Sequence, residues 1–173
     1  MLSEKVKNAV RVVKDFPKKG ILFRDITPVL GNYDLFKEVI DEMEALLKPY
    51  DIDVIAGLES RGFFFASPLA ERMKVGFVPV RKPGKLPYET YEENYSLEYG
   101  SGKLCIHTDA IKPGQNVAVI DDVLATGGTL NAAINLVEKF GITPKICLTF
   151  MEIEEIDGRS TIKKCPCEVL MKI

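Results

Sequence analysis

Two adjacent acidic residues, Asp121 and Asp122, stand inside the segment VAVIDDVLATGGT, which runs from residue 117 to residue 129. The four residues before the pair are all apolar, a pattern that predicts a strand buried on both faces, and residues 131–140 carry apolar side chains at helical spacing. Residues 121–129 are therefore expected to form a strand-to-helix turn that begins with two carboxylates.

The end of this turn is suited to a bound anion. Thr126, Gly127, Gly128 and Thr129 offer backbone N–H groups and hydroxyls at the start of a helix, where the macrodipole favours negative charge such as phosphate. Two carboxylates beside a phosphate would repel it unless they bind a cation or vicinal hydroxyls. A sugar phosphate supplies both groups, a phosphate for the loop and a ribose diol for the acids. The alternative is a capped turn whose aspartates are only solvated.

The composition limits the possible partners. The 173 residues are 46% hydrophobic and 28% charged, which fits one globular domain with a sizeable core. The net charge of −2 argues against a general nucleic-acid binder, which would carry a basic face. No leader-like segment follows Met1, and no apolar run approaches the about 20 residues that cross a bilayer. A cytoplasmic location without membrane contact is expected.

The cysteines lack the paired C-x-x-C spacing of zinc sites, and the only histidine is His107. Reduced thiols are expected, with a disulfide or metal role for Cys165 and Cys167 as the alternative. The four cysteines are Cys105, Cys147, Cys165 and Cys167.

Two helices are expected near the start of the chain, the first from Ser3 to Pro17 and the second from Asp34 to Pro49. Residues 22–24 would lie in the turn between them. The first helix would have one apolar face, made of Val6, Ala9, Val10 and Val13.

Strands and helices alternate after these two helices. Strands are expected at residues 53–57, 76–80, 103–107, 116–120 and 145–150, with helices at 63–73 and after Gly128. This alternation implies a mainly parallel sheet, whose ligands sit beyond the carboxyl ends of the strands. That rule brings three segments to one edge of the sheet, namely residues 59–62, 81–85 and 121–129.

Familiar nucleotide and acyl-transfer motifs do not fit. The chain contains neither G-x-x-x-x-G-K-[ST] nor G-x-G-x-x-G after a strand. GLESRG is not the G-x-S-x-G elbow, and a single histidine argues against a Ser-His-acid triad.

Cationic residues follow two of the predicted strands. Arg61 in ESRGF suits a polyanion through its planar fork, although a surface ion pair is the alternative. The segment RKPGKLPYETYEENYSLEYGS, residues 81–101, begins with Arg81, Lys82 and Lys85. Segments longer than about 12 to 15 residues without structure are usually lids or binding loops. A packed helix carrying the tyrosines of this segment is the alternative, which its prolines and glycine weaken.

Five motifs together resemble one known family. VAVIDDVLATGGT is similar to the phosphoribosyl pyrophosphate (PRPP) signature of type I phosphoribosyltransferases, and GILFRDITPVL, GLESRGF, RKPGKLPYET and YSLEYG stand in the order and spacing of the adenine-using members. The resemblance covers nearly the whole chain. It implies an α/β protein with the type I phosphoribosyltransferase fold, a mainly parallel sheet flanked by helices. An N-terminal base-binding hood would cover approximately residues 1–34, and a long flexible lid loop approximately residues 82–102.

The resemblance also implies where the parts of PRPP bind. The acid pair would hold the ribose hydroxyls, and the 5-phosphate would lie on Ala125, Thr126, Gly127, Gly128 and Thr129. The pyrophosphate loop would consist of Glu59, Ser60 and Arg61, often with a non-proline cis peptide. Arg81 and Lys85 would meet the pyrophosphate after the lid closes, and a homodimer is implied, in which these cations could serve the neighbouring site.

Adenine selectivity is implied by the same resemblance. A carbonyl of Leu22 and an N–H of Arg24 would bind the edge of the base, while Phe23 would stack on one face and Leu124 is a candidate for the other. Glu98 resembles the acid that meets adenine N7.

The expected reaction transfers the 5-phosphoribosyl group of PRPP to N9 of adenine and yields AMP and pyrophosphate. Glu98, Arg61 and Lys85 would be catalytic, and Mg²⁺ would be held mainly by substrate and water, with no dedicated metal site in the protein. Two rivals remain, a 6-oxopurine phosphoribosyltransferase and a PRPP-binding regulator without turnover. Ala125 stands where the 6-oxopurine enzymes that resemble this loop carry an acid, which favours adenine, and the chain has no spare length or basic face for a regulator.

Overall fold

A five-stranded parallel sheet, in the order β4-β3-β7-β8-β9, forms the centre of the fold. The protein is represented by a computed structural model that describes residues 1–97 and 100–173. The strands are β3 (Val54–Leu58), β4 (Gly76–Val80), β7 (Val117–Leu124), β8 (Ile146–Glu152) and β9 (Cys167–Lys172). All residues of β3 and β8 are buried, as expected for parallel strands that are covered on both faces. The predicted α/β class with a mainly parallel sheet is confirmed.

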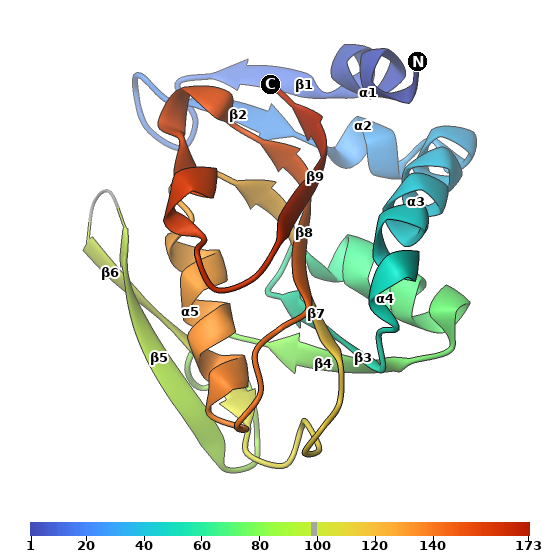
Figure 1. The fold of residues 1–173 in the computed structure, drawn as a ribbon. Helices are drawn as coiled ribbons and strands as arrows, with labels where there is room; N and C mark the ends of the chain where they lie inside the picture. Colours follow the sequence, from blue (N-terminus) through green and yellow to red (C-terminus); the bar gives the residue numbers. More distant parts are fainter. Residues whose placement is uncertain (98–99) are drawn as a thin grey trace. The chain divides into compact units, whose positions relative to one another are not determined.

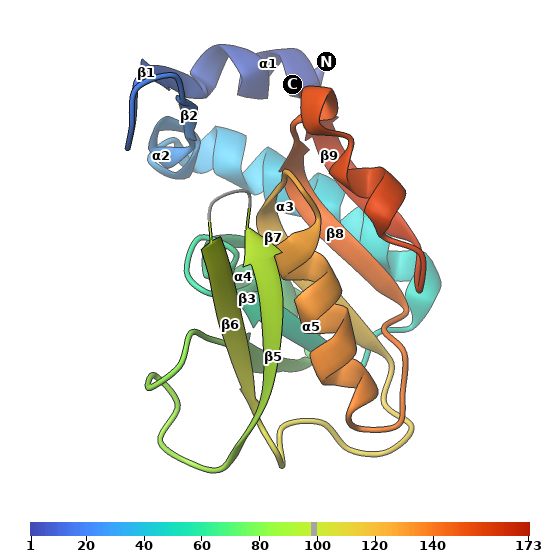
Figure 2. The ribbon, with the colours of Figure 1, turned by 90° about the vertical axis from the view of Figure 1, so that its left-hand side faces the viewer.

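Two helices flank this sheet. Helix α4 (Phe63–Met73) packs on β3, β4 and β7, and α5 (Gly128–Glu138) packs on β7 from the opposite face (Figures 1 and 2). Each follows the strand before it through a short loop, so its first turn lies at the carboxyl edge of the sheet. Helix α4 contains Pro68. Helix α5 is preceded by Gly127, which has a φ of 81°.

The acid pair lies within a strand, which corrects the predicted turn. Strand β7 continues through Asp121 and Asp122 to Leu124, and Asp121 pairs with Thr149 of β8. The parallel partner strand holds these charged residues in extended form despite their low strand propensity, because pairing and burial decide strand structure more than the residue type does.

The predicted lid segment contains an antiparallel hairpin. Strands β5 (Thr90–Leu97) and β6 (Gly100–His107) pair along their whole length. The hairpin packs along α5, where the Tyr91 and Phe140 rings meet edge to face at 5.2 Å and Asn135 Nδ2 donates to Glu93 at 3.0 Å. The alternative of a helix carrying the tyrosines is therefore wrong for residues 90–97.

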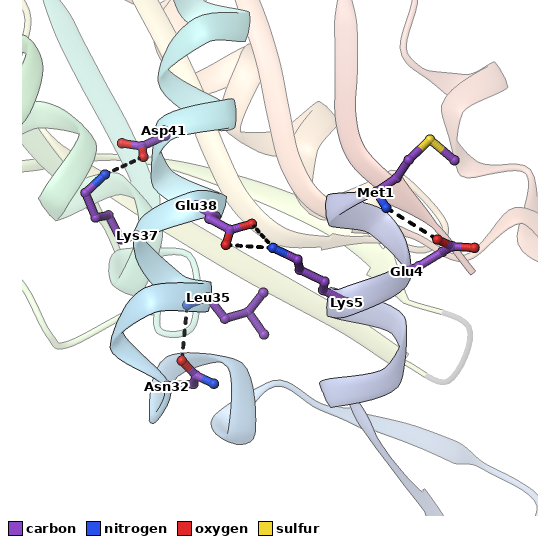
Figure 3. A network of polar contacts seen from close by, with 8 residues as sticks. All are labelled: Met1, Glu4, Lys5, Asn32, Leu35, Lys37, Glu38 and Asp41. Atoms are coloured by element: carbon purple, nitrogen blue, oxygen red, sulfur yellow. Dashed lines mark hydrogen bonds and ion pairs between the residues drawn. The ribbon is translucent and has the colours of Figure 1, made fainter.

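The chain divides into two compact units, Met1–Glu42 and Met43–Ile173. In the first, α1 (Leu2–Ala9) leads into a two-stranded antiparallel ribbon of β1 (Arg11–Lys14) and β2 (Leu22–Asp25), followed by the short α2 (Thr27–Leu30). Helix α3 (Tyr33–Leu47) begins in this unit, and Lys5 of α1 binds Glu38 of α3 at 2.8 Å (Figure 3).

The ribbon corrects two sequence predictions. The first helix ends at Ala9 rather than Pro17, and residues 22–24 form a strand rather than a turn. Val12 and Val13 are β-branched and favour extended structure once a partner strand is present. That partner, β2, lies about ten residues further along the chain and is invisible to helical periodicity.

The C-terminal part of the chain completes the second unit. After β8, two 3-10 turns, η2 (Glu154–Ile156) and η3 (Gly158–Thr161), lead to β9. A third such turn, η1 (Lys48–Tyr50), follows α3. Among the described residues, no helix has the length and apolar character needed to cross a membrane.

Candidate functional site

Two buried carboxylates lie side by side near the carboxyl end of β7. Asp121 Oδ1 accepts a hydrogen bond of 2.8 Å from the backbone N–H of Asp122. Asp122 Oδ2 lies 2.8 Å from Nε of Arg61, whose loop follows the neighbouring strand β3. The same Oδ2 accepts no hydrogen bond of ordinary geometry from the described residues, so the contact with Arg61 is electrostatic rather than well directed.

The acid pair is electrostatically strained. Burial and the neighbouring charge of Asp122 raise the pKa of Asp121 well above its ordinary value. Burial also raises the pKa of Asp122, and the nearby Arg61 guanidinium opposes that rise. Burial therefore disfavours the ionised form of both acids in the free protein, and a ligand that supplies hydroxyl donors or a cation would stabilise that ionised form.

The loop after β3 carries the predicted pyrophosphate residues. Glu59 binds Arg81, with Arg81 Nε 3.2 Å from Oε2, and it also accepts a 2.9 Å hydrogen bond from the Lys82 N–H. Burial pushes the pKa of Glu59 upward, but the Lys82 N–H and the Arg81 guanidinium outweigh it and hold the pKa below its usual value. The peptide bond between Glu59 and Ser60 is cis, the feature that the family resemblance implied for this loop.

Gly62 allows this loop to reach the acid pair. A Cβ on Gly62 would lie 2.6 Å from the Leu58 carbonyl oxygen and 3.0 Å from Asp121 Oδ1. Only a residue without a side chain fits such a close approach. The sequence placed Gly62 next to Arg61 but gave no sign of its contact with Asp121.

The predicted phosphate loop lies between β7 and α5. Gly127 adopts the left-handed conformation, and the Gly127 carbonyl accepts the Asn131 N–H at 2.9 Å. No acidic side chain occupies the first turn of α5, so the helix dipole favours an anion there, and the Gly128 N–H donates to the Thr126 hydroxyl oxygen at 3.4 Å. The Thr126 hydroxyl and the N–H groups of residues 127–129 are the groups that the sequence predicted for phosphate.

The structure brings together some predicted site residues and not others. Arg61 contacts Asp122, whose backbone N–H donates to Asp121, and Arg81 contacts Glu59. Arg81 Nη1 donates to the Lys85 carbonyl at 3.3 Å. Leu124 is 1% exposed and packs in the core cluster, so its contact with a base stays a prediction.

The remaining predicted residues cannot be placed in this site. Leu22, Phe23 and Arg24 lie on β2 in the first unit, where the Phe23 ring meets the Phe16 ring edge to face at 5.1 Å. Glu98 lies outside the described residues.

The donors for a metal ion are few. The residues that the structure describes contain no group of three or more His, Cys, Asp or Glu side chains that could hold a metal. Asp121 and Asp122 supply hard oxygen atoms, one of them without a directed hydrogen bond. This donor set suits magnesium, which commonly takes one or two carboxylates and completes its shell with water and substrate oxygens.

Nothing in the sequence indicated a role for the turns η2 and η3 after β8. Gly158 and Thr161 of η3 lie against the phosphate loop, because a Cβ on Gly158 would overlap the Ala125 carbonyl oxygen. The letters DGRST signal a turn but not its partner, since the contact spans more than 30 residues of chain.

Comparison with known proteins identifies relatives over almost the full length. A family model described as a phosphoribosyl transferase domain matches residues 31–171. An adenine phosphoribosyltransferase of Brachyspira hyodysenteriae is 48% identical over 167 residues, covering 96% of this chain and 98% of that protein.

Solved structures agree. The crystal structure of adenine phosphoribosyltransferase from Thermoanaerobacter pseudethanolicus has a TM-score of 0.96 and 46% identity, with 100% of both chains covered. The enzyme from Saccharomyces cerevisiae, solved with an imino-altritol bisphosphate and adenine, has a TM-score of 0.89 and 41% identity, with 96% of both chains covered.

Proposed function

The chain belongs to the phosphoribosyltransferase family, and we propose that it transfers the 5-phosphoribosyl group of PRPP to N9 of adenine. The products are AMP and pyrophosphate. The observation that carries this proposal is the buried acid pair on β7, followed directly by a glycine loop and an α5 first turn without acidic side chains. Among common metabolites, a sugar phosphate has the diol and the phosphate that these adjacent groups need.

PRPP occupies this edge of the sheet with each part facing a different loop. Asp121 and Asp122 accept hydrogen bonds from the ribose hydroxyls, and the 5-phosphate lies on the backbone of residues 125–129. The pyrophosphate faces Glu59, Ser60 and Arg61, with Arg81 and Lys85 supplying further positive charge. Arg61 and Arg81 each contact a carboxylate in the free protein, and we propose that both turn toward the pyrophosphate when it binds.

The reaction needs charge stabilisation rather than a nucleophilic side chain. The bond between ribose C1 and the pyrophosphate oxygen breaks, and the electron pair leaves with the pyrophosphate. Adenine N9 bonds to C1, and the proton on N9 passes to water. Arg61 and Lys85 stabilise the negative charge on the leaving group, the kind of contribution that usually dominates catalysis. Glu98 holds or shares a proton at adenine N7. Magnesium, when bound, neutralises part of the pyrophosphate charge.

We propose that backbone groups of β2 recognise the base, as the family resemblance implies. In a β-strand, residues two apart point their backbone groups to the same edge, so the Leu22 carbonyl and the Arg24 N–H face the same way on β2. An acceptor beside a donor matches the N6 amino group and N1 of adenine and opposes the O6 and N1–H of hypoxanthine. Phe23 stacks on the base and adds affinity without reading its edge, and Leu124 is proposed for the other face.

A turnover assay with PRPP, magnesium and each of adenine, hypoxanthine, guanine and xanthine tests the proposal. Adenine should be converted at least about 10⁴-fold more efficiently than the 6-oxopurines, because mismatched buried polar groups reject an analogue by that order. Comparable turnover of hypoxanthine would support the 6-oxopurine rival. Tight PRPP binding without turnover of any base would support the regulator.

Two variants test the base contacts. Arg24→Ala keeps the backbone N–H and should keep the preference for adenine, whereas Phe23→Ala should raise the adenine KM sharply. If Arg24→Ala used hypoxanthine as readily as adenine, selectivity would depend on the arginine side chain. The hypothesis that backbone groups select the base would then be wrong.

Assembly and location complete the proposal. We propose a homodimer in the cytoplasm, as the family resemblance implies, and light scattering of the purified chain tests the dimer. A monomer with full activity would show that cations of a neighbouring subunit are not needed for the reaction.

A further inference from the structure

The phosphate loop has little side-chain mass with which to hold its own shape. Its residues are 125–129, and its close contacts come from the segment after β8 and from Ser96 of β5. A Cβ on Gly127 would overlap the Thr161 hydroxyl, and one on Gly158 would overlap the Ala125 carbonyl oxygen. The loop and η3 therefore pack backbone against backbone.

Hydrogen bonds join these two segments to α5. The Thr161 hydroxyl donates to the Gly158 carbonyl at 2.7 Å and lies 3.4 Å from the Thr126 carbonyl. It accepts a hydrogen bond of 3.1 Å from Asn131 Nδ2 in the first turns of α5. A single hydroxyl thus touches the loop, the helix after it and η3.

Arg159 fixes η3 to the sheet. Its Nε lies 3.2 Å from Oε1 and 3.1 Å from Oε2 of Glu152, and its Nη2 lies 2.9 Å from Oε2. Its Nη1 donates to the Cys167 carbonyl of β9 at 2.9 Å. Glu152 is the last residue of β8 and pairs with Leu124, the last residue of β7 before the phosphate loop. The fork therefore links η3, β8 and β9 beside that loop.

We propose that Arg159 is a positioning residue for PRPP, acting through Gly158 and Thr161 to hold the phosphate loop in its binding conformation. A phosphate bound by several N–H groups requires all of them at fixed positions, and a misplacement of about 1 Å can cost roughly 10²-fold in rate. The inference rests on the proposed function, because it assigns the 5-phosphate to this loop. It gives the C-terminal segment a role in substrate binding.

The main test compares Arg159→Met with a matched control. Methionine keeps an apolar stem and removes the guanidinium fork. Arg72→Met is the control, since Arg72 in α4 is also 35% exposed and binds a carboxylate, that of Glu44, at 2.7 Å. The measurements are the melting temperature, kcat, and the KM values for PRPP and adenine.

Arg159→Met should raise the PRPP KM by about tenfold or more and leave the adenine KM within about twofold, while Arg72→Met should change neither. A purely structural role for Arg159 would lower the melting temperature and the amount of active enzyme without changing the PRPP KM, and that result would overturn the inference.

A second pair of variants covers the case in which Arg159→Met does not fold. Thr161→Val removes the hydroxyl at nearly constant volume and should raise the PRPP KM. Thr161→Ser keeps the hydroxyl and should have a PRPP KM near that of wild type. Equal PRPP KM values for valine and serine would overturn the inference.

Calorimetric titration with PRPP separates this inference from the proposed function. If the wild-type chain binds PRPP but does not convert adenine, the proposed activity fails, and the PRPP affinities of the same variants still decide the role of Arg159. An unchanged affinity in both Arg159→Met and Thr161→Val would overturn it.

Discussion

Two arginine–carboxylate pairs in the second unit have nearly the same burial and very different geometry. Arg61 and Asp122 are 35% and 6% exposed, and Arg159 and Glu152 are 35% and 5% exposed. Arg159 forms a fork with both oxygens of Glu152 and also binds the Cys167 carbonyl. Asp122 Oδ2 lies 2.8 Å from Arg61 Nε but accepts no directed hydrogen bond from any residue that the structure describes.

This difference in geometry indicates that the Arg159–Glu152 pair supports the structure and that the Arg61–Asp122 pair belongs to the binding site. A forked pair with several directed hydrogen bonds has a fixed geometry, because movement would break those hydrogen bonds. A buried carboxylate whose contact is only electrostatic keeps an unsatisfied acceptor, which costs stability until a ligand supplies a donor. We infer that the Arg159 pair holds the loop, while the Arg61 pair exchanges partners when PRPP arrives.

Removal of both site acids should have the largest effect. Asp121→Asn combined with Asp122→Asn should weaken PRPP binding by about 1.5 to 3 kcal/mol for each lost charged hydrogen bond, or roughly two to four powers of ten in total. Adenine binding should change far less. Calorimetric titration measures both affinities. An unchanged PRPP affinity would show that the ribose hydroxyls do not bind to this acid pair.

The cations that face the leaving group should affect turnover next most strongly. Lys85→Ala should lower kcat by about tenfold or more, because its charge is needed on the departing pyrophosphate. Lys82→Ala is the matched control, since the Lys82 contact with Glu59 is made by its backbone N–H and survives the change. The lid interpretation would be wrong if kcat and the PRPP KM of Lys85→Ala stayed within about twofold of wild type.

The two pairs should respond oppositely in stability when their carboxylate is made neutral. Glu152→Gln removes the charge opposite the Arg159 fork and should lower the melting temperature, at about 2 to 4 °C for each kcal/mol lost in a chain of this size. Asp122→Asn removes a charge that burial disfavours and should leave the melting temperature equal or higher. Calorimetric melting of both variants measures this. An equal fall in melting temperature in both would show that the two pairs do not differ in this way.

The smallest effect concerns the pH dependence of stability. The pKa of Asp121 is raised in the folded state, so folded protein holds this proton more tightly than unfolded protein does. Its contribution to stability is therefore largest below the ordinary aspartate pKa of about 4 and declines as pH rises through the folded-state pKa. Asp121→Asn should remove this decline, so its melting temperature relative to wild type should increase with pH. A difference that stays constant with pH would show that Asp121 is not destabilised by burial.

The second unit was largely predictable from its sequence. Residues 63–73 and 76–80 form the helix and strand that local patterns predicted, because each pattern coincides with the structure that the neighbouring elements require. The strand that carries Asp121 and Asp122 was predicted too short, since charged residues signal a turn locally and only the pairing with β8 keeps them extended.

The sequence did not predict several contacts between separate segments. The β1–β2 ribbon, the approach of Gly62 to Asp121 and the packing of Gly158 on Ala125 each join segments separated along the chain. A glycine indicates that a close approach is possible, and a pair of valines indicates that a strand is possible, but neither predicts which segment makes the contact. The identities of the candidate binding residues could thus be inferred from motifs, whereas the residues that support them could not.

A crystal structure with PRPP and magnesium tests the central claim most directly. We expect the ribose hydroxyls within hydrogen-bond distance of Asp121 and Asp122, and the 5-phosphate on the backbone of residues 125–129. Arg61 should have turned from Asp122 to the pyrophosphate, and the fork between Arg159 and Glu152 should be unchanged. A ribose bound away from the acid pair, with Arg61 still on Asp122, would contradict it.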